Sequence, residues 1–264
     1  MNFFNRFNKK HIIIAHRGFR AKMPENTIFA FKAAFGIADM FEFDVQFTKD
    51  KIPIIMHDTS LLRTTNAKEI FPHKKSYNVK NFTFAEIKQL DNISWFIKTN
   101  PYNLSPKELE KIKNLPKNSI PSLKETLGFI KKHNFPANLE IKSSFLSKTD
   151  TIRIICKMIS DLKVENLIII SSFNHEYLKI TKKLCPKLQT AALFEKKQKN
   201  LPGYLKSMKV SAYHTWDKIV EIKTVKHLLK HNIYTNVYTI NDKKRKNFLF
   251  SHKVKGIFSD FADI

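Results

Sequence analysis

Glycine, cysteine and acidic residues are scarce in this chain of 264 residues, and long apolar runs are absent. With five glycines in all, each glycine is expected to have a specific backbone role. The two cysteines, Cys156 and Cys185, are each predicted to lie in a helix. Their number and spacing exclude both a disulfide framework and a cysteine metal motif.

The shortage of long apolar runs argues against a membrane span, because residues 12–15 form a run far shorter than the roughly 20 residues required. The N-terminal sequence MNFFNRFNKK has no long apolar core or cleavage site, so it does not resemble a secretory signal. We therefore expect a cytoplasmic protein. The phenylalanines at positions 3, 4 and 7 lie beside basic residues, a pattern that fits weak association with a membrane surface. We favour the alternative that this segment packs as a cover on the fold.

Acidic residues number 23 against 47 lysines and arginines, which gives a formal net charge of +24. The cations are mostly lysines in small dispersed clusters, whereas nucleic-acid binding favours clustered arginine with interleaved aromatics. We therefore expect no nucleic-acid partner, although the charge attracts anionic substrates and membrane surfaces. The chain is 42% hydrophobic and 27% charged, as in a globular protein, and is long enough for one α/β barrel or two smaller domains.

Residues 40–58 read MFEFDVQFTKDKIPIIMHD and predict a strand, a turn and a second strand. Glu42 and Asp44 are two residues apart, so both carboxylates point to one face. The connection is too short for a parallel crossover, and an antiparallel return brings His57 back to their level. Paired carboxylates suit Mg²⁺ or Ca²⁺, and an imidazole suits proton transfer. The alternative is that the carboxylates lie on the solvated face of an amphipathic strand.

Eight apolar runs alternate with helical patterns when the antiparallel return run is left out. They begin near residues 12, 40, 137, 167, 188, 210, 234 and 256. Eight such units predict one (β/α)₈ TIM barrel over residues 1–264. Residues 59–120 break the alternation, because they are polar and turn-rich with short helices predicted at 83–90 and 105–113. We expect them to form an inserted lobe at the mouth of the barrel, between its second strand and second helix.

The active site of such a barrel lies at the C-terminal ends of its strands, and polar or aromatic residues gather there. They are His16, Arg17, Glu42, Asp44, Glu140, Lys142, Ser172, Phe173, Tyr238 and Asp260. If each pair is considered without the other residues, Glu140 and Lys142 are interpreted as a surface ion pair. Phe173 and Tyr238 are then interpreted as residues that pack at the barrel rim. Asp58 is interpreted as a turn or cap residue, and Asp260 as an anchor of the last strand. The eight histidines other than His16 and His57 are interpreted as surface or loop residues.

The motifs, taken in order, resemble the glycerophosphodiester phosphodiesterase family from residue 11 to the C-terminus. The opening motifs are His16-Arg17-Gly18, Pro24-Glu25-Asn26-Thr27, Glu42-x-Asp44-Val45, Thr48-x-Asp50, His57-Asp58 and Leu62-Arg63-Thr64-Thr65. The later motifs are Ser94-Trp95-Phe96, Ile120-Pro121-Ser122-Leu123, Glu140-x-Lys142, Ser171-Ser172-Phe173, Tyr238-Thr239-Ile240-Asn241 and Gly256-Ile257-Phe258-Ser259-Asp260.

The resemblance implies a TIM barrel with a small insertion, one bound divalent metal ion and a pair of catalytic histidines. Glu42, Asp44 and Glu140 are expected to bind the metal, Mg²⁺ or Ca²⁺. His16 and His57 are expected to act as general base and general acid in that order, although the sequence leaves the order open. Arg17 and Lys142 are expected to bind the phosphate, and Phe173 and Tyr238 to contact the substrate.

The activity that the resemblance implies is hydrolysis of a small-molecule glycerophosphodiester to glycerol 3-phosphate and an alcohol. The family often has Trp at the position of Tyr238, which bears on substrate preference, and Asn232 replaces a usual glycine. Lysophospholipase D activity, with Trp95 and Phe96 against an acyl chain, is an alternative. A non-catalytic binder of anionic ligands is another, but it has no use for paired histidines beside metal-binding carboxylates. The head group, the metal and the oligomeric state stay open.

Overall fold

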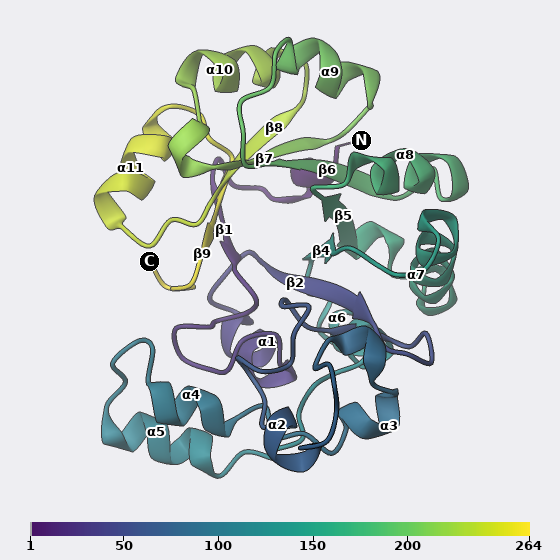
Figure 1. Ribbon diagram of the computed structural model, residues 1–264. Helices are drawn as coiled ribbons and strands as arrows, with labels where there is room; N and C mark the ends of the chain where they lie inside the picture. Colours follow the sequence, from purple (N-terminus) through teal and green to yellow (C-terminus); the bar gives the residue numbers. More distant parts are fainter. Residues whose placement is uncertain (1) are drawn as a thin grey trace.

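Eight parallel strands close into a barrel in the computed structural model, which describes residues 2–264 (Figure 1). They are β1 (Ile12–Ala15), β2 (Met40–Phe47), β4 (Ala137–Ile141), β5 (Ile168–Ser172), β6 (Gln189–Phe194), β7 (Ala212–Trp216), β8 (Tyr234–Tyr238) and β9 (Gly256–Ser259). The barrel closes because β1 pairs with both β2 and β9. The short strand β3 (Pro53–Ile55) pairs antiparallel with β2, as predicted for the return run. The TIM-barrel prediction is confirmed.

Helices surround the ring of strands and cover its outer face (Figure 1). They are α1 (Ile28–Ala34), α6 (Leu123–His133), α7 (Lys148–Leu162), α8 (His175–Leu184), α9 (Leu201–Ser207), α10 (Ile222–Lys230) and α11 (Lys243–Ser251), with short 3₁₀ turns η3 (Glu165–Leu167) and η4 (Asp217–Ile219). Capping residues define where several helices begin. At the start of α6, for example, Ser122 and Glu125 form the reciprocal hydrogen bonds of a capping box. None of the helices within residues 2–264 is long and apolar enough to cross a membrane.

Strand β2 shows how sequence alternation positions the site. Phe41 and Phe43 are fully buried in the apolar layer between the strands and the helices. The residues between them face the barrel interior, where Met40 packs among other apolar side chains. Glu42 and Asp44 follow Met40 at two-residue spacing, so they also face inward.

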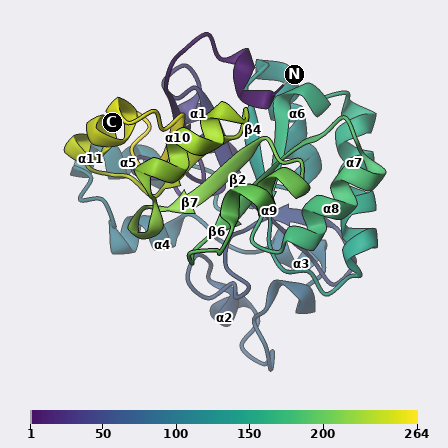
Figure 2. The ribbon, with the colours of Figure 1, turned by 90° about the horizontal axis from the view of Figure 1, so that it is seen from above.

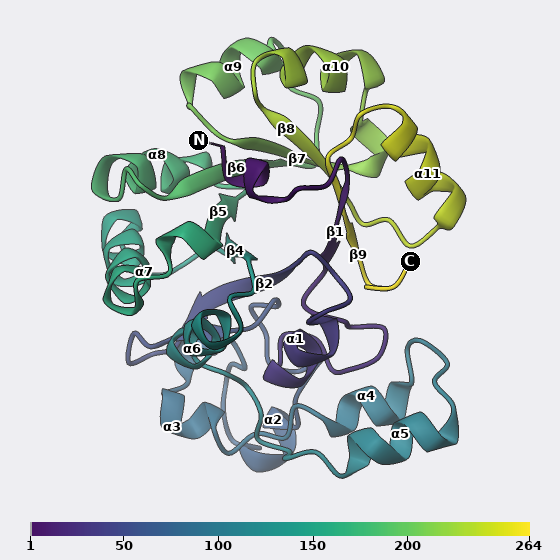
Figure 3. The same cartoon turned by 180° about the vertical axis from the view of Figure 1, so that it is seen from behind.

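The N-terminal segment closes one end of the barrel with the 3₁₀ turn η1 (Phe3–Arg6). Phe3 and Phe4 are buried in a cluster with inner-face residues of the strands, among them Ile14 and Phe258. Figure 3 shows this segment running across the end of the strands. The preferred prediction, that the segment is a cover on the fold, is confirmed.

His214 contradicts the prediction that the histidines outside the motifs lie at the surface or in loops. It occupies an inward position of β7 and is fully buried, with its ring 4.9 Å from that of Phe258 and 6.5 Å from that of Phe4. Neither ring nitrogen has a hydrogen-bond partner among the described residues. Burial lowers the pKa of His214 to about 3, so the ring is neutral near pH 7.

Residues 59–120 contain several short helices and contribute most members of two apolar clusters, which also include or contact Ile54, Met56, Met23 and Phe29. We refer to these residues as the inserted lobe. The lobe contains α2 (Ala67–Ile70), η2 (Val79–Asn81), α3 (Phe84–Ile87), α4 (Ser94–Thr99) and α5 (Pro106–Lys113). It lies beside α1 and α6 rather than across the ring of strands (Figure 1). Figure 2 shows α2 and the N-terminus at opposite ends of the barrel. The two predicted short helices are present as α3 and α5, whereas α2 and α4 are additional.

The turn after β1 needs glycine at position 18. Gly18 has a φ of +81°, and a Cβ added there would lie 2.7 Å from the backbone carbonyl carbon of Ala30. The turn therefore requires both a left-handed backbone and close contact with α1. Gly36 has a similar φ of +78°, but an added Cβ would meet nothing within 4 Å. Asn232, at a position where the family usually has glycine, also has a positive φ, of 57°.

We predict that Gly18→Ala destabilises the protein more than Gly36→Ala. Both substitutions place a Cβ in the left-handed region, which costs about 1–2 kcal/mol. Gly18→Ala also forces a backbone shift, which adds about 1–3 kcal/mol. Chemical denaturation of both variants measures the difference, and equal losses of stability would show that contact with α1 does not constrain the turn.

Candidate active site

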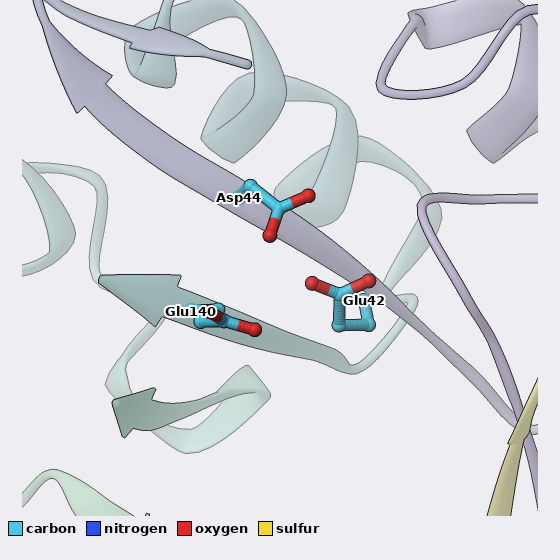
Figure 4. A group of neighbouring side chains, drawn as sticks. All are labelled: Glu42, Asp44 and Glu140. Atoms are coloured by element: carbon cyan, nitrogen blue, oxygen red, sulfur yellow. The ribbon is translucent and has the colours of Figure 1, made fainter. Parts of the chain in front are cut away.

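Three buried carboxylates converge inside the barrel from β2 and β4. Asp44 and Glu140 are paired in the strand register, and Glu42 lies one inward position earlier on β2. One ligand oxygen from each carboxylate lies within 4.8 Å of the others, and Figure 4 shows the three groups pointing toward one another. Glu42 and Asp44 are 2% and 1% exposed, which excludes the solvated-face alternative.

Two cations offset the repulsion among these carboxylates. The Lys142 ammonium lies 3.0 Å from Asp44 Oδ1 and donates a hydrogen bond to Glu140 Oε1, and Arg17 Nε lies 3.5 Å from Asp44. Burial by itself raises the pKa of Asp44, but Lys142 and Arg17 hold that pKa well below its usual range. The ion pair of Glu140 with Lys142 exists, but it belongs to the barrel interior and not to the surface.

The environment of Glu42 disfavours its ionised form. Burial, followed by the charges of Asp44 and Glu140, raises the pKa of Glu42 well above its usual value. Its Oε2 accepts a hydrogen bond from the Arg17 backbone N–H at 2.8 Å, whereas its buried Oε1 has no partner among residues 2–264. An unpartnered carboxylate oxygen within an all-oxygen donor set fits a hard cation such as Mg²⁺ or Ca²⁺.

Each of the two motif histidines is paired with an aspartate. His16 Nδ1 lies 2.8 Å from Asp260 Oδ1, and His57 Nδ1 lies 2.6 Å from Asp58 Oδ1. An aspartate bound to Nδ1 selects the tautomer in which Nε2 carries the free lone pair. Burial and the Arg17 charge lower the pKa of His16 to about 4, against an opposing effect of Asp260. His16 is therefore neutral near pH 7.

Asp58 and Asp260 thus have partners that the sequence analysis did not assign to them. Their interpretations as a turn residue and a strand anchor omit the histidines that they contact. The contact between Asp58 and His57 has one signal in the sequence, which is that the two residues are adjacent in the chain. For Asp260, the signal is that β9 pairs with β1, which carries His16 at its end.

Glu25 is a third residue, after Asp58 and Asp260, whose contacts the sequence analysis did not predict. Its carboxylate accepts hydrogen bonds from Arg17 at 2.8 Å, and from two further arginines. These are Arg20 at 2.8 Å and Arg63 of the inserted lobe at 2.6 Å. Burial opposes ionisation, but the three guanidinium groups lower the pKa of Glu25 to about 2. Glu25 therefore fixes the Arg17 side chain beside the carboxylates.

One cavity of about 190 Å³ joins the predicted site residues. It is lined by His16, Arg17, Glu42, His57, Asn138, Glu140, Lys142, Phe173, Leu193, Glu195, Tyr238, Thr239 and Phe258. Asp44 is not among the lining residues, but one of its carboxylate oxygens lies within 4.8 Å of ligand oxygens of Glu42 and Glu140, which do line the cavity. Asn138, Leu193, Glu195, Thr239 and Phe258 are additions to the predicted set.

The inserted lobe does not line this cavity. Phe96 is buried in the lobe's own core, and Trp95 packs beneath the Arg63 guanidinium at 5.7 Å from the ring centre. The lobe instead reaches the site through Arg63, which binds both Glu25 and Asp58. The structure therefore offers no support for contact of Trp95 or Phe96 with substrate.

Comparison with known proteins identifies the family to which this chain is similar. Residues 16–264 match the family model described as the glycerophosphoryl diester phosphodiesterase family. A glycerophosphodiester phosphodiesterase of Bacillus altitudinis is 30% identical over 256 residues, covering 95% of each chain. One from Caldanaerobacter subterraneus is 37% identical over 187 residues, covering 70% of this chain and 68% of the relative.

Solved structures agree in fold. A phosphodiesterase of Oleispira antarctica, in complex with the product sn-glycerol-3-phosphate, superposes with a TM-score of 0.83 at 24% identity, covering 100% of this chain and 97% of that one. A glycerophosphodiester phosphodiesterase of Thermotoga maritima superposes with a TM-score of 0.71 at 20% identity, covering 97% of each. On the match over nearly its whole length, this chain belongs to the glycerophosphoryl diester phosphodiesterase family, a family of hydrolases.

Proposed function

We propose that this protein hydrolyses small-molecule glycerophosphodiesters to glycerol 3-phosphate and an alcohol. The observation that carries the proposal is a single cavity lined by two aspartate-paired histidines, His16 and His57, and by two members of the buried carboxylate cluster, Glu42 and Glu140. The names of the relatives and the product bound to the Oleispira antarctica structure support the same reaction.

Glu42, Asp44 and Glu140 would hold one divalent cation, Mg²⁺ or Ca²⁺. A bound cation supplies positive charge that stabilises the negative charge growing on the phosphoryl oxygens. Arg17 and Lys142 line the same cavity and supply further positive charge for the phosphate. Because Glu25 holds the Arg17 guanidinium in place, little reorganisation is needed when substrate binds.

The two histidines would divide the proton transfers. His16 is neutral near pH 7, which suits a general base that accepts the proton of the attacking oxygen as the new P–O bond forms. Asp260 stabilises the imidazolium that results. His57 would donate its proton to the alcohol oxygen as the old P–O bond breaks, with Asp58 holding its ring. Asp58 is itself held by Arg63.

The cavity favours a water-soluble diester over a lysophospholipid. A volume of about 190 Å³ holds a polar head group, and Trp95 and Phe96 of the lobe are absent from its lining. An acyl chain would therefore have to extend outside the cavity. Hydrolysis of glycerophosphocholine and of a lysophospholipid, compared at equal concentration, separates the two substrate classes.

Metal dependence gives the first prediction for the proposed reaction. Excess chelator should abolish diester hydrolysis, and Mg²⁺ or Ca²⁺ should restore it. Glu42→Gln removes the negative charge of one proposed ligand. It should weaken metal affinity by about 100-fold or more, because replacing residues that only hydrogen-bond to metal ligands already costs about 10–100-fold. Glu69→Gln, at an exposed position of α2, is the matched control. Full hydrolysis in excess chelator would contradict the assignment.

The division of labour between the histidines gives a second prediction. His16→Ala and His57→Ala should each reduce kcat by about 10²–10⁴-fold, and the double variant by less than the product. A nitrophenyl diester has a good leaving group that needs little protonation. His57→Ala should therefore recover much of its rate on that substrate, whereas His16→Ala should not. Equal defects on good and poor leaving groups would rule out these roles.

Asp260→Asn tests how His16 is controlled. Because Asp260 raises the pKa of His16, its removal should lower that pKa and move the acid limb of the kcat/KM profile to lower pH. The plateau value of kcat/KM should fall by about tenfold or more, because the His16 imidazolium loses its partner. This loss is smaller than the 10²–10⁴-fold that general acid–base catalysis contributes as a whole. The control is Asp161→Asn, whose carboxylate pairs with Lys157 at the surface. An acid limb that moves to higher pH would refute this arrangement.

A further inference from the structure

Another cavity lies at the end of the barrel opposite to the proposed active site. Its volume is about 530 Å³, against about 190 Å³ for the active-site cavity. It is bounded by residues 4–11 ahead of β1, by Tyr234 at the start of β8, and by residues 253 and 255 ahead of β9. These segments meet at the N-terminal ends of the strands, where the N-terminal segment crosses the barrel (Figure 3). We call this space the basal cavity.

Positive charge gathers in the basal cavity without matching negative charge. Four lysines line it, and its lining within residues 2–264 includes no acidic side chain. The nearby Asp39 is already occupied, because Oδ1 pairs with Lys9 at 2.6 Å and Oδ2 accepts the backbone N–H of Ile13 at 2.8 Å. The other three lysines make no ion pair in the part of the chain that the structure describes. These three unpaired lysines are Lys10, Lys253 and Lys255.

Lys255 is held inside the protein and is not a loose surface side chain. It is 7% exposed, and its ammonium donates a hydrogen bond to the backbone carbonyl of Lys9 at 2.5 Å. The same ammonium lies 5.6 Å from the centre of the Tyr234 ring. Burial lowers the pKa of Lys255, so its positive charge is unfavourable in this environment. A buried ammonium without a carboxylate is costly, and a bound anion would supply the missing partner.

The charges of the three unpaired lysines also act together on His11, which lines the same cavity. Burial lowers the pKa of His11, and these three lysines lower it further, against the effect of a hydrogen bond with the Val254 carbonyl. The ring is therefore neutral near pH 7 and adds no charge of its own. The effect on one ring shows that lysines from both walls share a single region of positive potential.

We propose that the basal cavity binds a small polyphosphate anion, either inorganic or part of a nucleoside di- or triphosphate. One phosphate group carries at most about two negative charges, fewer than the three unpaired lysines can match. Two or three linked phosphates carry more charge and extend across the cavity, whose volume lies within the roughly 300–1,000 Å³ of small-molecule sites. Lysine is a common partner of phosphate oxygens. The site is separate from the active site and does not depend on the proposed hydrolysis.

Calorimetric titration of the full chain with tripolyphosphate tests the basal cavity. Chelator is present throughout, so that a metal ion at the carboxylates does not contribute. Tripolyphosphate should bind saturably, and inorganic phosphate at least about tenfold more weakly. Lys10→Gln should weaken tripolyphosphate binding by about threefold, as for one partly exposed charge pair, and Lys255→Met by about tenfold, as for a buried charged hydrogen bond. Lys142→Gln, in the active site, should leave this affinity unchanged.

Lys183→Gln is the matched control, because Lys183 is exposed in the last turn of α8 and lies outside the lining. It removes the same charge as Lys10→Gln and should not change the affinity. Lys10 and Lys253 are exposed, so Lys10→Gln and Lys253→Gln carry the test if Lys255→Met does not fold.

The outcomes distinguish a built site from general attraction to a chain with a net charge of +24. Equal losses in Lys10→Gln and Lys183→Gln, or no saturable binding of tripolyphosphate, would overturn the proposal. A loss confined to Lys142→Gln would place the anion in the active site and would also overturn it. Titration with ATP identifies the source of the phosphates. Tighter binding of ATP than of tripolyphosphate supports a nucleotide ligand, and equal binding supports recognition of the phosphate chain alone.

Discussion

Repulsion among three buried carboxylates is the constraint on which the rest of this structure depends. Glu42, Asp44 and Glu140 have ligand oxygens within 4.8 Å of one another in the barrel interior. Ionised carboxylates at such spacing require positive charge, and Lys142 and Arg17 provide it. Burying so much charge is costly for stability, so the arrangement indicates a functional demand. We propose that this demand is the binding of a cation and of an anionic substrate.

The need to place Arg17 explains the local structure after β1. Arg17 itself has a φ of 55°, and Gly18 follows with a φ of +81°. This turn directs the Arg17 backbone N–H to Glu42 and its guanidinium to Glu25. Glu25 in turn binds Arg63, so the inserted lobe stabilises the site from outside the cavity. The left-handed backbone of the turn and the contacts of Glu25 with three arginines thus both position Arg17 beside the carboxylates.

The strands and the shared face of Glu42 and Asp44 could be predicted from sequence because both follow from two-residue periodicity, whereas the interpretation of Glu140 as a metal ligand came from the family resemblance. The predicted strand starts agree with the observed ones within two residues, and Glu42 and Asp44 lie on the expected face. His214 was misjudged although the same alternation in AYHTW places it inward.

Other features depend on tertiary contacts and have little sequence signal. The pairing of Asp260 with His16 spans 244 residues and requires the barrel to close. Glu195 has no motif, and only the cavity reveals it. Helices α2 and α4 are four and six residues long, too short for apolar periodicity to be seen, and the lobe's own packing stabilises them.

The central claim is that the three carboxylates together bind one hard cation. An anomalous difference map from a crystal of the protein soaked in Mn²⁺, an ion with the same preference for oxygen ligands, tests it most directly. The account predicts a single strong peak bounded by Glu42, Asp44 and Glu140, with the Lys142 ammonium moved away from Glu140. A peak elsewhere, or Lys142 still bound between Asp44 and Glu140 with no peak beside them, would contradict it.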